Sequence, residues 1–190
     1  MEIFFFVLIG ALVAILIYGV LIYNNLVRLK HDVTKAWANI DVLLKQRHDE
    51  LPKLVETCKQ YMKFEQETLE KVMQARAAVN TAASRGDVGA LGAAEGQLRL
   101  GLGNLFAVAE NYPDLKTNET FIHLQSRITG LENSIADRRE FYNESVNINN
   151  VRVEQFPDNI VAQRFGFKQA ELLEFDAAEL TDVNMGTLFG

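Results

Sequence analysis

Six charged residues stand on, or directly beside, helical repeats of apolar residues in this 190-residue chain. In an antiparallel helical bundle, such side chains meet in the interior. A buried charge has to be paired, because an unpaired one is strongly destabilising. We therefore predict one structural network of salt bridges that fixes the register of the helices. Its expected members are Arg47, Glu65, Arg76, Glu110, Glu132 and Arg138, and Asn149 is a further polar residue on the last repeat.

The same carboxylates could instead bind a metal ion or transfer protons. A bundle that holds two metal ions typically supplies Glu from two helices and Glu-x-x-His from two others. The sequence contains no Glu-x-x-His, and His31, His48 and His123 do not repeat at ligand spacing. Arginine beside the acids also disfavours a bound cation. We therefore expect no metal ion, no cofactor and a structural role for the network.

Other catalytic signatures are missing from the sequence, which has neither Gly-x-Ser-x-Gly nor His-Glu-x-x-His. The single cysteine, Cys58, cannot form an internal disulfide, and we interpret it as a small core residue rather than a nucleophile. The glycines between residues 89 and 103 are not a nucleotide loop, because no strand precedes them. We interpret them as sites of close helix packing, the alternative being a partly flexible start of that helix. The prediction is a protein that is not an enzyme.

The N-terminal stretch from Ile3 to Tyr23 has 21 residues and no charged side chain. A helix rises about 1.5 Å per residue, so this stretch can cross a hydrocarbon core of roughly 30 Å. A cleaved signal peptide has a basic head, a shorter apolar run and a small-residue cleavage site, none of which occurs here. We therefore predict a retained single-pass anchor over residues 1–23, in contact with membrane lipid through residues 3–23.

Charge indicates where the rest of the chain lies. Arg28, Lys30 and Lys35 follow the anchor, and the positive-inside rule then favours a cytoplasmic C-terminal domain at a bacterial inner membrane. A periplasmic domain is the alternative, because two residues before the anchor give the rule little to compare.

The formal net charge of −6 disfavours nucleic acid as a partner, since nucleic-acid binding requires neutralised phosphates.

From Asn24 to about Arg47, apolar residues recur three and four positions apart, which is typical of an amphipathic helix. No Gly or Pro separates this stretch from the anchor, so we expect one continuous rod. Pro52 suits the first turn of the next helix. Further helices are predicted over about 52–84, 88–111 and 118–155, with Asn118 as the N-cap of the last. The pattern predicts an all-α fold: a transmembrane helix that continues into an antiparallel up-down bundle of long helices over residues 24–157.

The segment 158–190 differs in character from the bundle. It is predicted to form a short helix followed by an acidic tail. Its aromatic side chains are too many for a free linker, so we expect them to fold back onto the bundle or to contact a neighbouring subunit. The residues of this interaction surface are Phe156, Phe165, Phe167 and Phe175.

Several stretches of the sequence resemble the LemA family and occur in the family's order. They are YNNLV (23–27), AW (36–37), IDVLLK (40–45), LPKLVET (51–57), AVAENYPDLK (107–116), ENSIA (132–136), FP (156–157) and GF (166–167). The resemblance implies a bacterial protein with an N-terminal anchor and a long antiparallel bundle, without catalytic residues to carry over. It also implies that the six charged residues match recurring polar positions and belong to one network.

What is known of the family points to a role at a membrane. One relative is associated with magnetosome membranes, and family genes often neighbour those of membrane-linked proteases. Some relatives resemble lipoproteins, whose domain lies outside the cytoplasm, but this chain lacks the acceptor cysteine after its apolar stretch.

The function predicted is a non-enzymatic, membrane-anchored helical scaffold that self-associates into a homo-oligomer and organises partners at the bacterial inner membrane. The alternative is an accessory or regulatory subunit of a membrane protease or transporter, which binds one dedicated partner. A third hypothesis, an enzyme with an interior carboxylate site, predicts metal bound to the purified protein.

Overall fold

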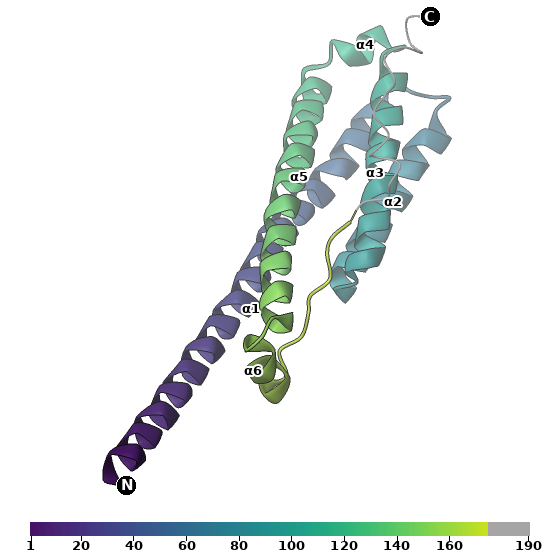
Figure 1. The fold of residues 1–190 in the computed structure, drawn as a ribbon. Coiled ribbons are helices and arrows are strands. Elements are labelled where there is room, and N and C mark those ends of the chain that lie inside the picture. Colours follow the sequence, from purple (N-terminus) through teal and green to yellow (C-terminus); the bar gives the residue numbers. More distant parts are fainter. Residues whose placement is uncertain (175–190) are drawn as a thin grey trace, which may run out of the picture. The chain divides into compact units, whose positions relative to one another are not determined.

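The computed structural model describes residues 1–174, and the regular secondary structure over that range is entirely helical. This confirms the predicted all-α fold. The helices are α1 (Glu2–Lys59), α2 (Gln66–Arg85), α3 (Val88–Ala109), α4 (Pro113–Lys116), α5 (Glu119–Glu154) and α6 (Asp158–Phe165) (Figure 1). The chain divides into two compact units. We call Met1–Ala38 with Glu140–Glu171 the anchor unit, and Asn39–Arg139 with the segment from Leu172 the bundle unit.

Helix α1 runs without a break, so the apolar stretch and the amphipathic stretch after it form one helix, as predicted (Figure 1). The prediction that a new helix begins at Pro52 is wrong, because Pro52 lies inside α1. A proline removes the helical hydrogen bond to the carbonyl four residues earlier. That carbonyl belongs to His48, and Nε of Arg76 in α2 donates to it at 2.9 Å. Arg76 thus supplies the donor that Pro52 lacks, and α1 continues to Lys59.

In the bundle unit, α2 and α3 form a packed hairpin. Gly86 ends α2 with a φ of 66°, a left-handed conformation that glycine adopts without strain. Asp87 then caps α3, because its Oδ1 accepts a hydrogen bond from the backbone N–H of Ala90 at 2.9 Å. The core is aliphatic, and its most deeply buried side chains include Leu54, Leu91, Leu98, Leu105 and Ile128.

Two glycines of α3 lie against another segment. A Cβ at Gly92 would stand 1.9 Å from the backbone oxygen of Glu174, so the chain passes directly over this glycine. A Cβ at Gly101 would make ordinary contact with Val72 of α2, at 3.5 Å. At Gly103 nothing lies within 4 Å of such a Cβ. Close packing therefore explains Gly92 and contributes at Gly101, but it does not explain the glycines as a group.

Asn118 caps α5, as the sequence predicts. Its Oδ1 accepts a hydrogen bond from the backbone N–H of Phe121 at 3.0 Å, and its Nδ2 donates to the hydroxyl of Tyr61 at 3.1 Å. The cap therefore also joins the start of α5 to the connection between α1 and α2.

In the anchor unit, residues 3–18 of α1 are exposed. By length and composition, α1 is the one helix within residues 1–174 that could span a membrane. Burial begins at Ile22 and Leu26, which pack against Ala162 of α6, and Val153, Val161 and Phe167 complete this small apolar cluster. Helix α6 therefore covers α1 where its apolar stretch ends.

After α6 the chain turns at Gly166, which has a φ of 73°, and lies along α5 as an extended segment, residues 167–171, which we call the strap. Asn150 binds Ala170 twice: its Nδ2 donates to the carbonyl oxygen and its Oδ1 accepts from the backbone N–H, both at 2.9 Å. Asn149 Nδ2 donates to the carbonyl of Lys168 at 3.3 Å. The polar Asn149 on an apolar repeat thus helps to hold the strap.

Candidate functional site

Three helices of the bundle unit meet around one buried arginine. Arg47 of α1 is 1% exposed, and its Nη1 donates to Oε1 of Glu132 in α5 at 2.6 Å. Its Nη2 forms an ion pair with Glu95 of α3. The side chain of Glu95 is 4% exposed and that of Glu132 is 17% exposed. We call these three residues the ion triad, and it links the register of α1, α3 and α5.

The electrostatics of the triad favour a structural role. Burial opposes the charge of Arg47, but attraction to Glu95 and Glu132 and the hydrogen bonds with both outweigh it, so the pKa of Arg47 is raised. A guanidinium that keeps its proton is neither an acid nor a base at neutral pH. The triad therefore suits the pairing of charges between helices better than proton transfer.

The structure brings two of the six predicted network residues, Arg47 and Glu132, into contact. Arg76 lies instead at the proline turn of α1, where its Nη2 is 2.6 Å from Nε2 of His48 in addition to the bond to the His48 carbonyl. Burial, and then the charge of Arg76, lower the pKa of His48. The neutral ring is therefore favoured, and it can accept a hydrogen bond from the guanidinium.

The other predicted network residues lie outside the triad. Glu65 is half-buried at the N-cap position of α2. Glu110 is exposed and pairs with Lys116. Arg138 is exposed on α5. The structure therefore joins Arg47 and Glu132 directly, and it places Glu65, Arg76 and Glu110 at other positions of the bundle unit.

Glu95 is the triad member that the sequence prediction missed. It follows Leu91 by four residues and precedes Leu98 by three, which is the spacing of the apolar repeat itself. Ala94 fits the same repeat and is also buried, so the apolar repeat can be followed through Ala94 without considering Glu95. A search for charges at repeat spacing within α3 could have found Glu95.

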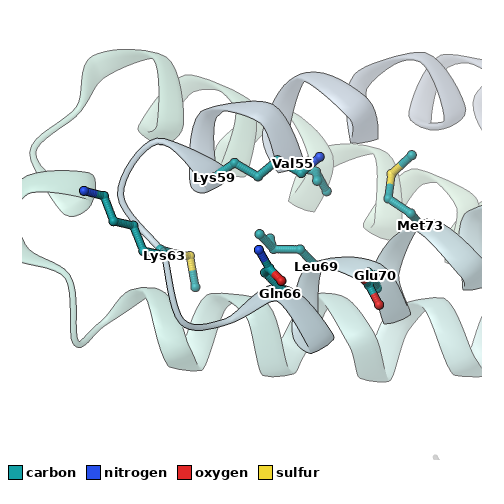
Figure 2. Close-up of a pocket in the computed structure, with 8 residues that line it drawn as sticks. Val55, Lys59, Lys63, Gln66, Leu69, Glu70 and Met73 are labelled. Carbon is teal, nitrogen blue, oxygen red and sulfur yellow. The ribbon is translucent and has the colours of Figure 1, made fainter.

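A groove of about 770 Å³ opens where α1 passes into α2 (Figure 2). Its apolar lining includes Leu69 and Met73 of α2, and Lys59 and Lys63 stand at the same groove with Glu70. Its lining has one carboxylate, Glu70, and no histidine, cysteine or hydroxyl. A groove with this mixture of apolar and charged side chains is suited to contact with another chain.

Cys58 is fully buried in the bundle unit, and burial raises the pKa of its thiol to about 12. Such a thiol stays protonated and reacts slowly. In the part of the chain that the structure describes, no group of three or more His, Cys, Asp or Glu residues could hold a metal ion.

The predicted aromatic surface lies in the anchor unit as far as it is described. Phe156 is 79% exposed and Phe165 62%, whereas Phe167 is half-buried. The ring of Tyr23 in α1 contacts both Phe165 and Phe167, with centroids 4.9 and 5.7 Å away. Phe175 lies outside the described residues. Two of these aromatic rings therefore fold back, and they contact the end of the apolar stretch.

A polar clamp holds α6 to its neighbours. The carboxylate of Asp158 is 2% exposed and accepts from Nε of Arg152 at 2.8 Å and from Nε2 of Gln155 at 3.1 Å. In the amide orientation that satisfies both partners, Asn25 of α1 accepts from Nη2 of Arg152 at 2.6 Å. The clamp thus joins α1, α5 and α6 beside the apolar cluster.

Helix α5 also exposes an apolar face in the anchor unit. Phe141, Ile148 and Val151 are 62, 43 and 50% exposed. They are spaced seven and three residues apart, so they share one face of the helix. We call these three residues the α5 face.

Comparison with known proteins gives one consistent family. A sequence model of the LemA family matches residues 36–185. Protein LemA of Metamycoplasma hominis is 28% identical over 191 residues, which cover 98% of this chain and 85% of that protein.

Two other relatives are magnetosome proteins by name. Magnetosome protein MamQ 2 of Paramagnetospirillum magneticum is 36% identical over 107 residues, which cover 55% of this chain and 39% of the relative. Magnetosome protein MamQ of Magnetospirillum gryphiswaldense is 24% identical over 184 residues, covering 85% of this chain and 68% of the relative. The chain thus spans well under half of the length of MamQ 2.

Proposed function

The chain belongs to the LemA family, and from this premise we propose that it is a non-enzymatic, membrane-anchored helical scaffold that self-associates and organises partners at a bacterial inner membrane. The apolar end of α1 supports the membrane location, as do the relatives named magnetosome proteins. Arg28, Lys30 and Lys35 follow the span, so the positive-inside rule favours the cytoplasmic side for the remaining chain.

One observation carries the self-association. The α5 face presents three large, exposed apolar side chains, with the exposed Glu144 between Phe141 and Ile148, on a unit that also carries the membrane span. Exposed apolar patches rimmed by polar residues mark interaction sites in soluble regions. Apolar residues repeated along one helix face are also the pattern by which helices pair with each other. A second copy of the same chain, held at the same depth by its own anchor, offers the matching face.

Cysteine crosslinking in native membranes tests this proposal. Because Cys58 is buried, an Ile148→Cys substitution introduces one accessible thiol on the α5 face. Asn147→Cys places a thiol at the neighbouring exposed position, rotated about 100° away on the helix. We expect a short bis-maleimide to convert the Ile148→Cys chain into a discrete dimer and to leave the control monomeric. A strictly monomeric Ile148→Cys chain, or equal crosslinking at both positions, would exclude self-association through this face.

The alternative, an accessory subunit of a membrane protease or transporter, is favoured by a different observation. Phe64 is 92% exposed in the connection that also lines the groove of Figure 2. A dedicated partner would cover this side chain. Under this function, a Phe64→Ser variant loses one co-purified membrane protein and keeps the Ile148→Cys dimer. Under the scaffold function, it keeps both.

A further inference from the structure

Helix α6 lies where the membrane-spanning stretch ends. That stretch closes at Tyr23, whose ring contacts Phe165 at the end of α6. The next charged residue along α1 is Arg28, five positions later, or about 7.5 Å along the helix axis. Tyrosine favours the boundary between acyl chains and headgroups. With α1 across a bilayer, Phe165 therefore stands at that boundary.

Helix α6 and the residues flanking it expose three large apolar side chains among polar and basic ones. Phe156, Ile160 and Phe165 are 79, 60 and 62% exposed, and Arg164 and Lys168 are exposed beside them. Bulky apolar side chains with basic neighbours are typical of segments that lie in a membrane interface. The long basic side chains reach the headgroups while the apolar ones enter the acyl region. In water the same surface is unfavourable.

The position of α6 is fixed within the anchor unit. The polar clamp around Asp158 ties it to α1 and α5, and Ala162 packs on Ile22 and Leu26. Its depth in a membrane therefore follows from the depth of α1. A free tail with the same composition would have no defined depth.

We propose that Phe156, Ile160 and Phe165 form a second lipid-contact site, which inserts into the boundary between acyl chains and phospholipid headgroups on the side where α1 leaves the bilayer. The inference rests on one part of the proposed function, namely that α1 spans the membrane. It adds a contact that the span alone does not provide. Two lipid contacts on one unit fix the tilt of that unit relative to the bilayer, whereas a single span leaves the tilt free.

Depth-dependent fluorescence quenching of the full chain in phosphatidylcholine vesicles tests the site. Trp37 is the single tryptophan, so a Trp37→Phe background carries one reporter at a time. The reporter is Phe165→Trp, and Phe141→Trp is the matched control because Phe141 is also 62% exposed. The control lies far from the boundary: the adjacent Tyr142 contacts Trp37, which is about 21 Å beyond Tyr23 along α1.

We expect lipid brominated in the upper acyl chain to remove most of the emission at position 165 and to leave position 141 unchanged. Equal loss at both positions, or no loss at 165, overturns the proposal. Emission at 165 that resists bromine and is also shielded from aqueous iodide assigns this surface to a protein partner and overturns it too.

Two further reporters separate this inference from its premise. Phe6→Trp lies within the apolar stretch, so its quenching tests the span itself. If brominated lipid quenches the emission at position 6 but not at position 165, the lipid site alone is overturned. If the emission at position 6 is not quenched either, the membrane span is overturned as well. Phe156→Trp, at the most exposed of the three positions, gives a second measurement of the site if the Phe165→Trp chain does not fold.

Discussion

Replacing Arg47 by methionine tests whether the ion triad organises the bundle unit. Methionine keeps most of the apolar stem but removes the charge from a side chain that is 1% exposed. Two carboxylates then lose the guanidinium that lies between them; Glu95 is only 4% exposed and Glu132 is 17% exposed. The substitution therefore removes a positive charge from beside two carboxylates instead of merely deleting a contact.

The expected cost follows from that burial. Breaking a buried ion pair by removing one partner costs about 3–5 kcal/mol, because the other charge stays desolvated. Whole domains are stable by about 5–15 kcal/mol, so this is a large fraction of the total. Replacing all three charges together, as Arg47→Met/Glu95→Met/Glu132→Met, should recover most of the loss, since a buried triad exchanged for apolar residues of similar size is often neutral or stabilising.

The assay is denaturant unfolding of the full chain in detergent, followed by circular dichroism, with the free energy of unfolding taken by linear extrapolation. Lys116→Met is the control, because Lys116 is 46% exposed in its pair with Glu110 and its loss should cost at most about 1 kcal/mol. The loss in free energy of unfolding of Arg47→Met, relative to the unsubstituted chain, should also become smaller as pH falls. At low pH the Glu95 and Glu132 carboxylates of the folded variant bind protons and lose their charge. A deficit no larger than that of the control, or a triple variant less stable than Arg47→Met, refutes the reasoning.

Three further outcomes are expected. Gly92→Ala should destabilise the bundle unit, because its Cβ would stand 1.9 Å from a backbone oxygen, whereas Gly103→Ala, with nothing within 4 Å, should stabilise it by up to about 1 kcal/mol in the same unfolding assay. Arg76→Met should leave the His48 carbonyl without its donor and cost about 1–3 kcal/mol, and equal stability would show that water replaces it. Cys58, buried and with its pKa raised to about 12, should resist thiol reagents until the chain unfolds, and rapid labelling of the native protein at pH 8 would contradict its burial.

Local sequence patterns predicted an all-helical chain, but the helix predicted over about 52–84 is interrupted at residues 60–65, between the end of α1 and the start of α2. The apolar stretch, the repeats and the cap at Asn118 are properties of neighbouring residues, and local patterns predicted them. Pro52 is different, because whether it ends a helix depends on a donor for the His48 carbonyl. That donor, Arg76, lies 28 residues away from His48 along the chain. No local pattern reports it, so the predicted boundary at Pro52 was wrong.

The ion triad shows the same limit for the site. Arg47 and Glu132 could be predicted, because their positions relative to apolar repeats place them on or next to a buried face. Glu110 and Arg138 satisfy nearly the same criterion, and yet both are exposed. One position along a helix rotates a side chain by about 100°, so a residue beside the repeat can face either way. Which way it faces depends on the helices that pack against it, and a single sequence does not specify those helices.

Buried charge and exposed apolar surface lie on different residues of this protein, so stability and interaction can be changed separately. Charge is buried in both units, at Arg47, Glu95 and Glu50 of the bundle unit and at Asp158 of the anchor unit, all less than 9% exposed. Apolar side chains are exposed at other residues, on the α5 face, around α6 and at Phe64. Loss of the Arg47 charge should therefore lower the free energy of unfolding whether or not the chain is associated with another copy. A polar residue in place of Ile148 should instead remove contacts with the other copy and leave the free energy of unfolding of the monomer nearly unchanged. The proposed scaffold function is consistent with this separation, since a surface that binds another chain can then act without unfolding the buried core.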